Sequence, residues 1–330
     1  MKKIRQLALI LITALFILPI LVSCERGESN VVTIVTTSED FRIEHIQRRL
    51  NEQFPQYRII INYMTTGNLG ATLMAAGTAI DADIIGELEV TFLERSLDSL
   101  ADLSEFDYSP FLPELVPAHR RWLPFVRGSG SIIINESFLA ARGIPIPTSY
   151  QCLIRPEFRG VLSMPNPRTS GTGFFFLKSL VNAWGEDAAF EYFDRFAENV
   201  LQFTSSGAGP VNALIQGEVG IGLGLTFQAV TAINERGAPL TITHFEEGSP
   251  YMLYGMAIVR GRETRQAVRD VFAFYVDVLT REDKELFAPE QIFIEQVNNI
   301  PNYPQNVRPA DMRGAESPEV RERLMARWRF

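Results

Sequence analysis

Cysteine and histidine are scarce in this chain of 330 residues. The three histidines, His45, His119 and His244, are far apart, and no two of them have the spacing of zinc ligands. The sequence therefore predicts no metal site. The two cysteines, Cys24 and Cys152, are too few for the disulfide frameworks that stabilise small secreted proteins.

Catalytic motifs are missing as well. The chain contains no G-x-S-x-G, no G-x-x-x-x-G-K-[ST], no H-E-x-x-H and no G-x-G-x-x-G after a predicted strand. Acidic residues are frequent, but no pair of carboxylates stands out as an acid and base couple. We therefore expect a protein that is not an enzyme and needs no cofactor.

Positive charge is in deficit. The chain has 31 Lys and Arg against 39 Asp and Glu, and three of the basic residues, Lys2, Lys3 and Arg5, lie at the N-terminus. Without them, 28 basic residues face 39 acidic ones, which leaves a net charge near −11. A nucleic-acid partner would need a basic face, so the composition argues against one.

The N-terminus has the features of a secretory signal. The basic residues precede an apolar stretch from Leu7 to Val22, which is shorter than the ~20 apolar residues of a membrane-spanning helix. Leu21-Val22-Ser23-Cys24 resembles the lipobox of bacterial lipoproteins. We expect a signal peptide at 1–23, a lipidated Cys24 and a linker over 24–30. The alternative is a chance cysteine after a plain signal peptide.

Strands and helices are expected to alternate after the linker. Apolar and β-branched runs predict strands at 31–35, 57–63 and 81–85, and apolar residues at helical spacing separate them. This order predicts a parallel sheet with helices on both faces. The segment 143–167 holds five prolines and predicts mostly loop, whereas 263–280 predicts one long amphipathic helix. About 300 residues beyond Cys24 suffice for two domains.

Four clusters of hydroxyl residues and glycines stand out, most of them between a strand and a helix. They lie at 36–38, 65–67, 169–173 and 205–210. Helix N-termini leave N–H groups unpaired, so such clusters suit a polar or anionic ligand, although each alone can be a helix cap. The candidate ligand-binding residues in them are Thr37, Ser38, Thr66, Gly67, Ser170, Gly171, Thr172, Ser206 and Gly207.

Several segments resemble the type II periplasmic binding proteins of the ferric-iron, phosphonate and sugar-phosphate group. These segments are Thr169-Ser170-Gly171-Thr172-Gly173 with the helix that ends at Ala183-Trp184-Gly185-Glu186-Asp187, Ser206-Gly207-Ala208-Gly209-Pro210-Val211, Gln216-Gly217-Glu218-Val219-Gly220-Ile221-Gly222, Asp81-Ala82-Asp83-Ile84 and Pro156-Glu157-Phe158-Arg159-Gly160. The likeness covers essentially the whole chain beyond the signal.

The resemblance implies an α/β fold of two lobes, each a mainly parallel sheet flanked by helices, with a ligand in the cleft between them. Residues 31–127 plus 256–330 would form the first lobe and 128–255 the second, with hinge crossings at its ends. It also implies a monomer that delivers a small molecule to an ABC importer.

Other residues bear on the ligand. Arg127 could pair with phosphate or carboxylate, and Glu87 with an amine or sugar hydroxyls, but each can also be an ordinary surface residue. In ferric-binding relatives adjacent tyrosines follow the strand that matches 220–225, whereas this chain has Thr226, Phe227 and Gln228 there. Because phenylalanine offers no ligand atom, the sequence disfavours iron, and we include Thr226 and Gln228 among the ligand-binding candidates.

These observations predict an extracytoplasmic, lipid-anchored solute-binding protein that captures a small polar, anionic ligand. Phosphate, phosphonate and carboxylate compounds are the expected class. The alternatives are a ferric-iron-binding protein, which Tyr251 and Tyr254 keep open, a sensing subunit for a membrane kinase, and an extracytoplasmic enzyme.

Overall fold

A computed structural model describes residues 30–296 and 299–330 of the chain. The predicted signal peptide and Cys24 lie outside these ranges, so signal cleavage and lipidation stay predictions. In the described ranges, no helix has the length and apolar character required to cross a membrane.

The first lobe is built on three parallel strands, as the alternation of elements predicted. These are β1 (Val31–Thr36), β2 (Arg58–Tyr63) and β3 (Ile84–Glu89), and β1 lies between the other two. The helices α2 (Asp40–Gln53) and α3 (Thr66–Ala76) connect them. The strand predicted at 81–85 is displaced toward its C-terminus, because Ile80 and Asp83 belong to the turn before it.

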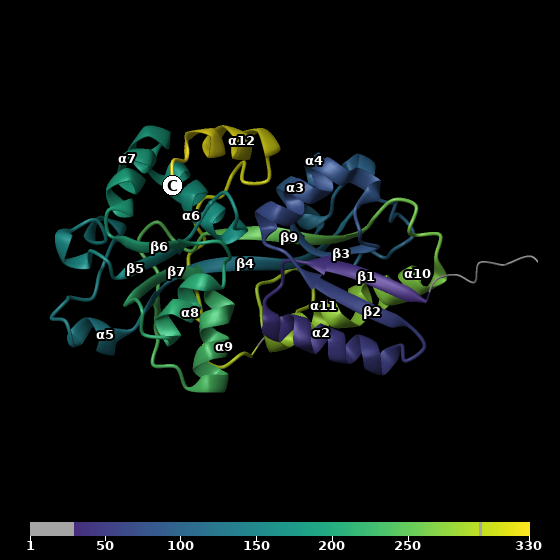
Figure 1. The fold of residues 1–330 in the computed structure, drawn as a ribbon, viewed down its shortest axis with the longest axis horizontal. Helices are drawn as coiled ribbons and strands as arrows, with labels where there is room; N and C mark the ends of the chain where they lie inside the picture. The colour runs from purple at the N-terminus through teal and green to yellow at the C-terminus, as the bar shows by residue number, and fades with distance from the viewer. Residues whose placement is uncertain (1–29, 297–298) are drawn as a thin grey trace, which may run out of the picture.

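Two long antiparallel strands connect the lobes. Strand β4 (Leu123–Ile134) pairs with β9 (Tyr251–Ile258) as far as Ser129, and from Gly130 onward it pairs with β7. One strand thus belongs to the sheets of both lobes, and Figure 1 shows it crossing the middle of the molecule. The domain boundaries themselves stay a prediction.

The second lobe repeats the parallel arrangement. The strand order of the whole sheet is β2-β1-β3-β9-β4-β7-β5-β6, and β8 pairs with β4. The elements of the second lobe are β5 (Leu162–Pro165), α6 (Gly171–Trp184), α7 (Glu186–Ala197), β6 (Val200–Thr204), α8 (Gly209–Ile215), β7 (Ile221–Leu225), α9 (Thr226–Arg236) and β8 (Thr241–Thr243). The predicted two-lobed α/β fold is confirmed, with antiparallel strands at the centre and parallel strands on either side.

The C-terminal segment returns across both lobes. The helix predicted at 263–280 is present as one continuous helical run: α10 (Gln266–Phe274), a π-helical turn over Tyr275–Leu279 and α11 (Thr280–Leu286) follow each other without a break. Helix α12 (Pro318–Arg327), yellow in Figure 1, contacts α4 (Val90–Arg95) in the first lobe. The residues after it reach the second lobe, where the ring of Trp328 packs against Phe193. The C-terminal segment therefore contacts both lobes.

The remaining elements are short. They are α5 (Glu136–Ala140) and the 3-10 turns Gly77–Ala79, Leu97–Ser99, Pro113–Leu115, Tyr150–Cys152 and Pro156–Phe158.

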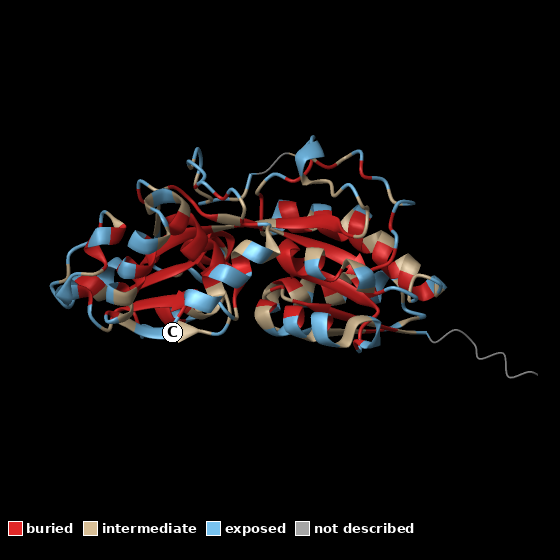
Figure 2. Cartoon of the chain, turned by 90° about the horizontal axis from the view of Figure 1, so that it is seen from above, coloured by how far each residue is buried: buried red, intermediate tan, exposed pale blue. Residues whose placement is uncertain are grey.

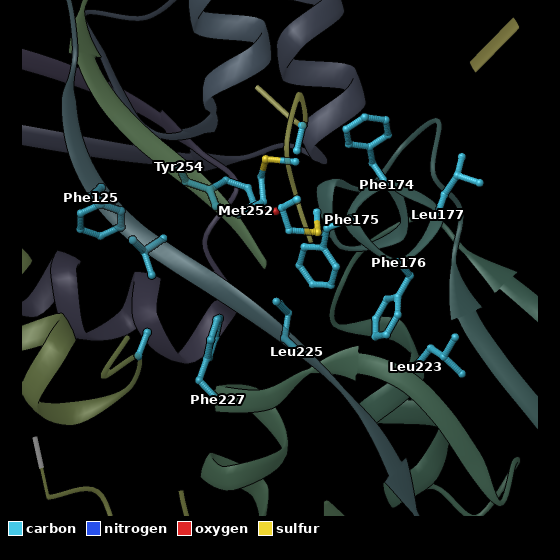
Figure 3. Packing of buried hydrophobic residues seen from close by; sticks show 14 of the residues in the cluster. Phe125, Phe174, Phe175, Phe176, Leu177, Leu223, Leu225, Phe227, Met252 and Tyr254 are labelled. Carbon is cyan, nitrogen blue, oxygen red and sulfur yellow. The ribbon is translucent and has the colours of Figure 1, made fainter. Parts of the chain in front are cut away.

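The central strands of both lobes are buried, and exposed residues lie on the outer helices and loops (Figure 2). An aromatic and aliphatic cluster fills the space where the lobes meet. Figure 3 shows Leu225, Phe227 and Tyr254 in this cluster, together with Phe174 to Phe176 of α6. Apolar packing therefore supports the polar residues at the boundary between the lobes.

Candidate ligand-binding site

A cavity of about 160 Å³ lies at the seam between the lobes. Its lining comes from the carboxyl ends of strands and the helix starts that follow them, which is where open α/β sheets bind ligands. The lining residues are Thr37, Glu39, Asp40, Tyr63, Thr65, Thr66, Glu87, Val126, Gly128, Thr169, Ser170, Thr172, Ser206, Gly207, Ala208, Asn212, Leu225, Phe227 and Tyr254. Both lobes contribute, so the cavity exists only while they are in contact.

The second-lobe wall is the start of helix α6. Ser170 caps this helix, because its Oγ accepts a hydrogen bond from the N–H of Gly173 at 3.5 Å. The N–H groups of the first helical turn have no acceptor within the helix. Thr172 lies in that turn, is buried and lines the cavity. Ser170 therefore supports the helix, and Thr172 offers a hydroxyl to whatever fills the cavity.

These two residues provide a matched test of the site. We expect Thr172→Ala to weaken ligand affinity about tenfold, the equivalent of ~1.4 kcal/mol, with little change in the melting temperature of the unliganded protein. Ser170→Ala should instead destabilise the unliganded protein by ~1 kcal/mol, the usual cost of a lost cap. Calorimetric titration and thermal melts of both variants measure the two effects. A Thr172→Ala variant that melts earlier but keeps full affinity would assign Thr172 to the helix alone.

The first-lobe wall is the start of helix α3 and the end of β1. Thr65 and Thr66 line the cavity there, beside Thr37. The Oγ1 atoms of Thr37 and Thr65 are buried, and neither has a hydrogen-bond partner in the part of the chain that the structure describes. Because buried polar atoms are normally satisfied, two unpartnered hydroxyls at one cavity indicate that a polar group completes the site.

The lobes touch at the edge of this wall. The N–H of Gly67 donates to the carbonyl oxygen of Thr169 at 2.9 Å, which joins α3 to the loop before α6. A Cβ on Gly67 would lie 2.5 Å from the carbonyl oxygen of Arg168. The structure therefore shows the cleft closed, with only a glycine fitting at this contact.

The floor of the first-lobe wall is an ion-pair network around Arg42, which is 0% exposed. Its Nη1 lies 2.8 Å from Glu87 Oε2 and 3.1 Å from Glu39 Oε2, and its Nε lies 2.7 Å from Asp283 Oδ1. Ser38 adds a hydrogen bond to Glu87 Oε2 at 2.7 Å. These contacts fix the two glutamates that face the cavity.

The cavity itself carries negative charge. Its lining includes Glu39, Asp40 and Glu87 but no lysine, arginine or histidine. Burial raises the pKa of Glu39 to about 7, against the opposing effect of the Arg42 guanidinium. In the described ranges, no group of three or more histidine, cysteine, aspartate or glutamate residues is arranged to hold a metal ion.

Comparison with known protein families identifies the kind of protein that has this two-lobed cleft. Residues 82–283 match the family described as bacterial extracellular solute-binding protein. The chain belongs to this family. The match runs from β3 to α11 and includes the whole second lobe, and membership implies solute binding outside the cytoplasm.

Two curated relatives of this solute-binding protein match over part of their length. An uncharacterized protein of Haemophilus influenzae is 33% identical over 156 residues, which are 46% of this chain and 43% of the relative. The phosphoglycerate transport regulatory protein PgtC of Salmonella typhimurium is 27% identical over 199 residues, or 59% of this chain and 49% of the relative. The chain thus spans less than half the length of each curated relative.

Solved structures share the fold at low sequence identity. The periplasmic binding protein P5PA aligns with a TM-score of 0.78 and 22% identity, over 90% of this chain and 98% of that one. AfuA of Actinobacillus pleuropneumoniae, with fructose-6-phosphate bound, has a TM-score of 0.74 at 20% identity over 90% and 97%. Iron-bound HitA of Pseudomonas aeruginosa has a TM-score of 0.74 at 16% identity over 90% and 97%.

The structure brings most of the predicted site residues together. Seven of them line the cavity: Thr37, Thr66, Glu87, Ser170, Thr172, Ser206 and Gly207. Three others lie directly behind it. Ser38 holds Glu87, Gly67 makes the contact between the lobes, and a Cβ on Gly171 would lie 2.4 Å from the hydroxyl of Tyr254. That these residues bind a ligand stays a prediction.

Three predicted residues lie elsewhere. Arg127 is on β4, where Val126 and Gly128 face the cavity, and the alternation of a strand directs Arg127 to the opposite face. It lines a separate cavity there with Thr226. Gln228 lies outside the main cavity, in a smaller compartment beside it.

Sequence reasoning missed several lining residues. Glu39, Asp40 and Asn212 belong to no motif, Tyr63 is only the last residue of a predicted strand, and Tyr254 is named only as an alternative iron ligand. Position could have found four of them, since Glu39, Asp40 and Asn212 lie at helix starts and Tyr63 ends β2. Tyr254 lies inside β9, so position does not mark it.

Proposed function

We propose that this protein is an extracytoplasmic lipoprotein that captures a small polar ligand in the cleft and delivers it to an ABC importer. The observation that carries the proposal is the convergence of two helix N-termini, those of α3 and α6, on one closed cavity. Both helices exceed ten residues, and the unpartnered hydroxyls of Thr37 and Thr65 lie in the same space.

This geometry suits an oxyanion at one end of the ligand. Helix starts combine free N–H donors with partial positive charge, and exclusion of water on closure strengthens each bond. Hydrogen bonds to a charged group contribute roughly 1.5–3 kcal/mol each. Two or three of them contribute roughly 3–9 kcal/mol, whereas micromolar binding needs about 8 kcal/mol after the entropic cost of association is subtracted, so other contacts in the cavity must contribute as well.

The relatives support this ligand class. PgtC is named for phosphoglycerate transport, and AfuA is described with fructose-6-phosphate, and both compounds carry phosphate. The regulatory name of PgtC also supports the second candidate function, a subunit that reports ligand to a membrane sensor. A structure described as a two-component signal-transduction protein shares the fold at 18% identity with a TM-score of 0.65.

The test of the proposal is a thermal-shift screen of the purified protein. The panel contains phosphates, phosphonates, carboxylates and ferric citrate. We expect stabilisation by at least one oxyanion compound, because ligands that bind only the native state raise its stability. Stabilisation by ferric citrate alone, with a coloured complex, would support the iron-binding alternative. No stabilisation by any oxyanion compound would contradict the proposal.

The proposed membrane anchor rests on Leu21-Val22-Ser23-Cys24. We expect the protein extracted from membranes to begin at Cys24 and to carry acyl chains on it. Mass spectrometry of the N-terminal peptide measures this directly. Cys24→Ser should yield a protein without acyl chains, because serine has no thiol to carry the lipid. An N-terminus at another residue, or acyl chains on the Cys24→Ser variant, would contradict the anchor.

A further inference from the structure

The cleft extends beyond its main cavity. A side compartment of about 90 Å³ shares Glu39, Asp40, Ala208 and Asn212 with that cavity. The other residues of the side compartment are Phe41, Val211, Ile215, Gln228, Thr231, Ala232 and Arg236. A ligand whose one end reaches the starts of α3 and α6 can therefore place its other end among Glu39, Asp40 and Gln228.

Gln228 presents an unused acceptor in the side compartment. Its side chain is buried, with 7% of the residue exposed, and its Nε2 donates to the carbonyl oxygen of Ala208 at 3.1 Å. The Oε1 atom on the same amide is buried and has no partner in the described part of the chain. Because an unsatisfied buried acceptor costs ~1–3 kcal/mol, this atom favours a donor supplied by the ligand.

The charges around the compartment select the type of donor. Glu39 and Asp40 line both spaces, and Glu87 lines the main cavity. The one cation that lines the side compartment, Arg236, is exposed. Arg42 lies behind the wall, where Glu39, Glu87 and Asp283 share its charge. Two carboxylates and an amide oxygen, beside one buried cation whose charge three carboxylates already share, suit a protonated amine, which has three N–H donors and no acceptor.

We propose that the ligand is a zwitterion, whose oxyanion lies at the starts of α3 and α6 and whose protonated amine lies among Glu39, Asp40 and Gln228 Oε1. This inference rests on the proposed function and specifies its ligand class. An acidic lining alone would repel a simple anion. The amine offsets that repulsion, so one site accommodates both the helix starts and the carboxylates.

Protonation of Glu39 gives the site a pH dependence. Burial raises the pKa of this carboxyl to about 7, and Glu87 adds to the shift while Arg42 opposes it. The other charged or titratable groups near Glu39 are Asp40, Tyr63 and Tyr254, which share the cavity lining, and Asp283, on the far side of Arg42. An aliphatic amine stays protonated well above pH 7, so its binding strengthens as Glu39 loses its proton. Affinity for the zwitterion is therefore expected to rise between about pH 6 and pH 8.

The test uses pairs of probes that differ only in the amine. Calorimetric titration compares 2-aminoethylphosphonate with propylphosphonate, and phosphoethanolamine with propyl phosphate, at pH 6 and pH 8. We expect the amine to improve affinity at least tenfold at pH 8 in one pair, and less at pH 6. Asp40→Asn and Glu39→Gln should each remove most of this preference, by weakening the amine probe and by strengthening its amine-free partner, which a less acidic lining repels less.

Thr172→Ala is the matched control, because it should weaken both members of a pair equally. If the amine-free probe binds as tightly as its amine partner, the zwitterion is wrong and the oxyanion site stands. The same conclusion follows if Asp40→Asn and Glu39→Gln weaken both members alike. If no probe of either pair binds, the oxyanion site is contradicted, and the inference is contradicted with it.

Discussion

Replacing Arg321 with methionine is expected to lower the free energy of unfolding by about 3–5 kcal/mol, the usual cost of breaking a buried ion pair from one side. Arg321 lies in α12 and is 4% exposed, and its Nη1 is 2.5 Å from Oε1 of Glu89, which is 0% exposed. Its guanidinium also lies over the rings of Phe92 and Phe174, at 4.6 and 4.2 Å from their centres.

The cost comes mainly from the carboxylate that is left behind. Without Arg321, Glu89 keeps a hydrogen bond from Thr91 but no opposite charge, and its Oε2 already has no partner in the described part of the chain. Phe92 belongs to the first lobe and Phe174 to the second, so the cation also joins the lobes. The melting temperature should fall on the order of 10 °C.

Urea and thermal unfolding of the unliganded protein measure the effect. The double variant Arg321→Met with Glu89→Gln should recover much of the loss, because no buried charge then remains. Arg321→Lys should give an intermediate loss, since lysine keeps the charge but lacks the planar group that stacks between two rings. A single Arg321→Met variant that loses less than about 1 kcal/mol would show that water reaches Glu89 and replaces the cation.

The sequence predicted the elements whose pattern is local. The β-branched run predicted β1, and apolar residues at helical spacing predicted α2. Both patterns follow from burial of the element and repeat over a few residues, so the sequence alone is enough to recognise them. The strand β5 was missed, because it is four residues long and lies in a proline-rich segment. It pairs with β6 and β7 and is contacted by α8, all of which lie far along the chain, so no local pattern marked it.

The candidate site was predictable to the extent that helix starts mark it. Hydroxyl clusters identified the walls at Thr66 and Thr172, since helix starts need such residues. Arg127 lies outside the main cavity because its side chain is on the other face of β4, and the sequence alone does not determine which face of that strand is turned to the cavity. Glu39 was missed as cavity lining because its environment depends on Arg42 and, through it, on Asp283, which lies 241 residues from Arg42.

Replacing Gly67 with alanine is expected to weaken ligand binding by about 10- to 100-fold while leaving the unliganded fold intact. The new Cβ would lie 2.5 Å from the carbonyl oxygen of Arg168 and 2.8 Å from Cα of Thr169. Both atoms are backbone of the other lobe, so the clash exists only when the cleft is closed. Overpacking of this kind costs typically 1–3 kcal/mol, and here the closed state bears that cost.

The Gly67→Ala clash should not destabilise the open state. Gly67 lies in the first turn of α3, and alanine is favoured over glycine in helices by up to ~1 kcal/mol, so the unliganded variant should melt at the same temperature or slightly higher. Asn68→Ala is the matched control. Asn68 is exposed in the same turn, so alanine there also raises the helix propensity but does not face the other lobe.

Calorimetric titration with the tightest probe of the panel measures the affinities of the three proteins. Small-angle scattering measures the closure itself, which is the hinge motion expected of two lobes around a ligand. The radius of gyration should fall on binding for the natural sequence and for Asn68→Ala, and should fall less for Gly67→Ala. If Gly67→Ala binds and contracts like the natural sequence, then the contact between Gly67 and Thr169 is absent from the liganded protein, and the cleft closes around its ligand along a different path.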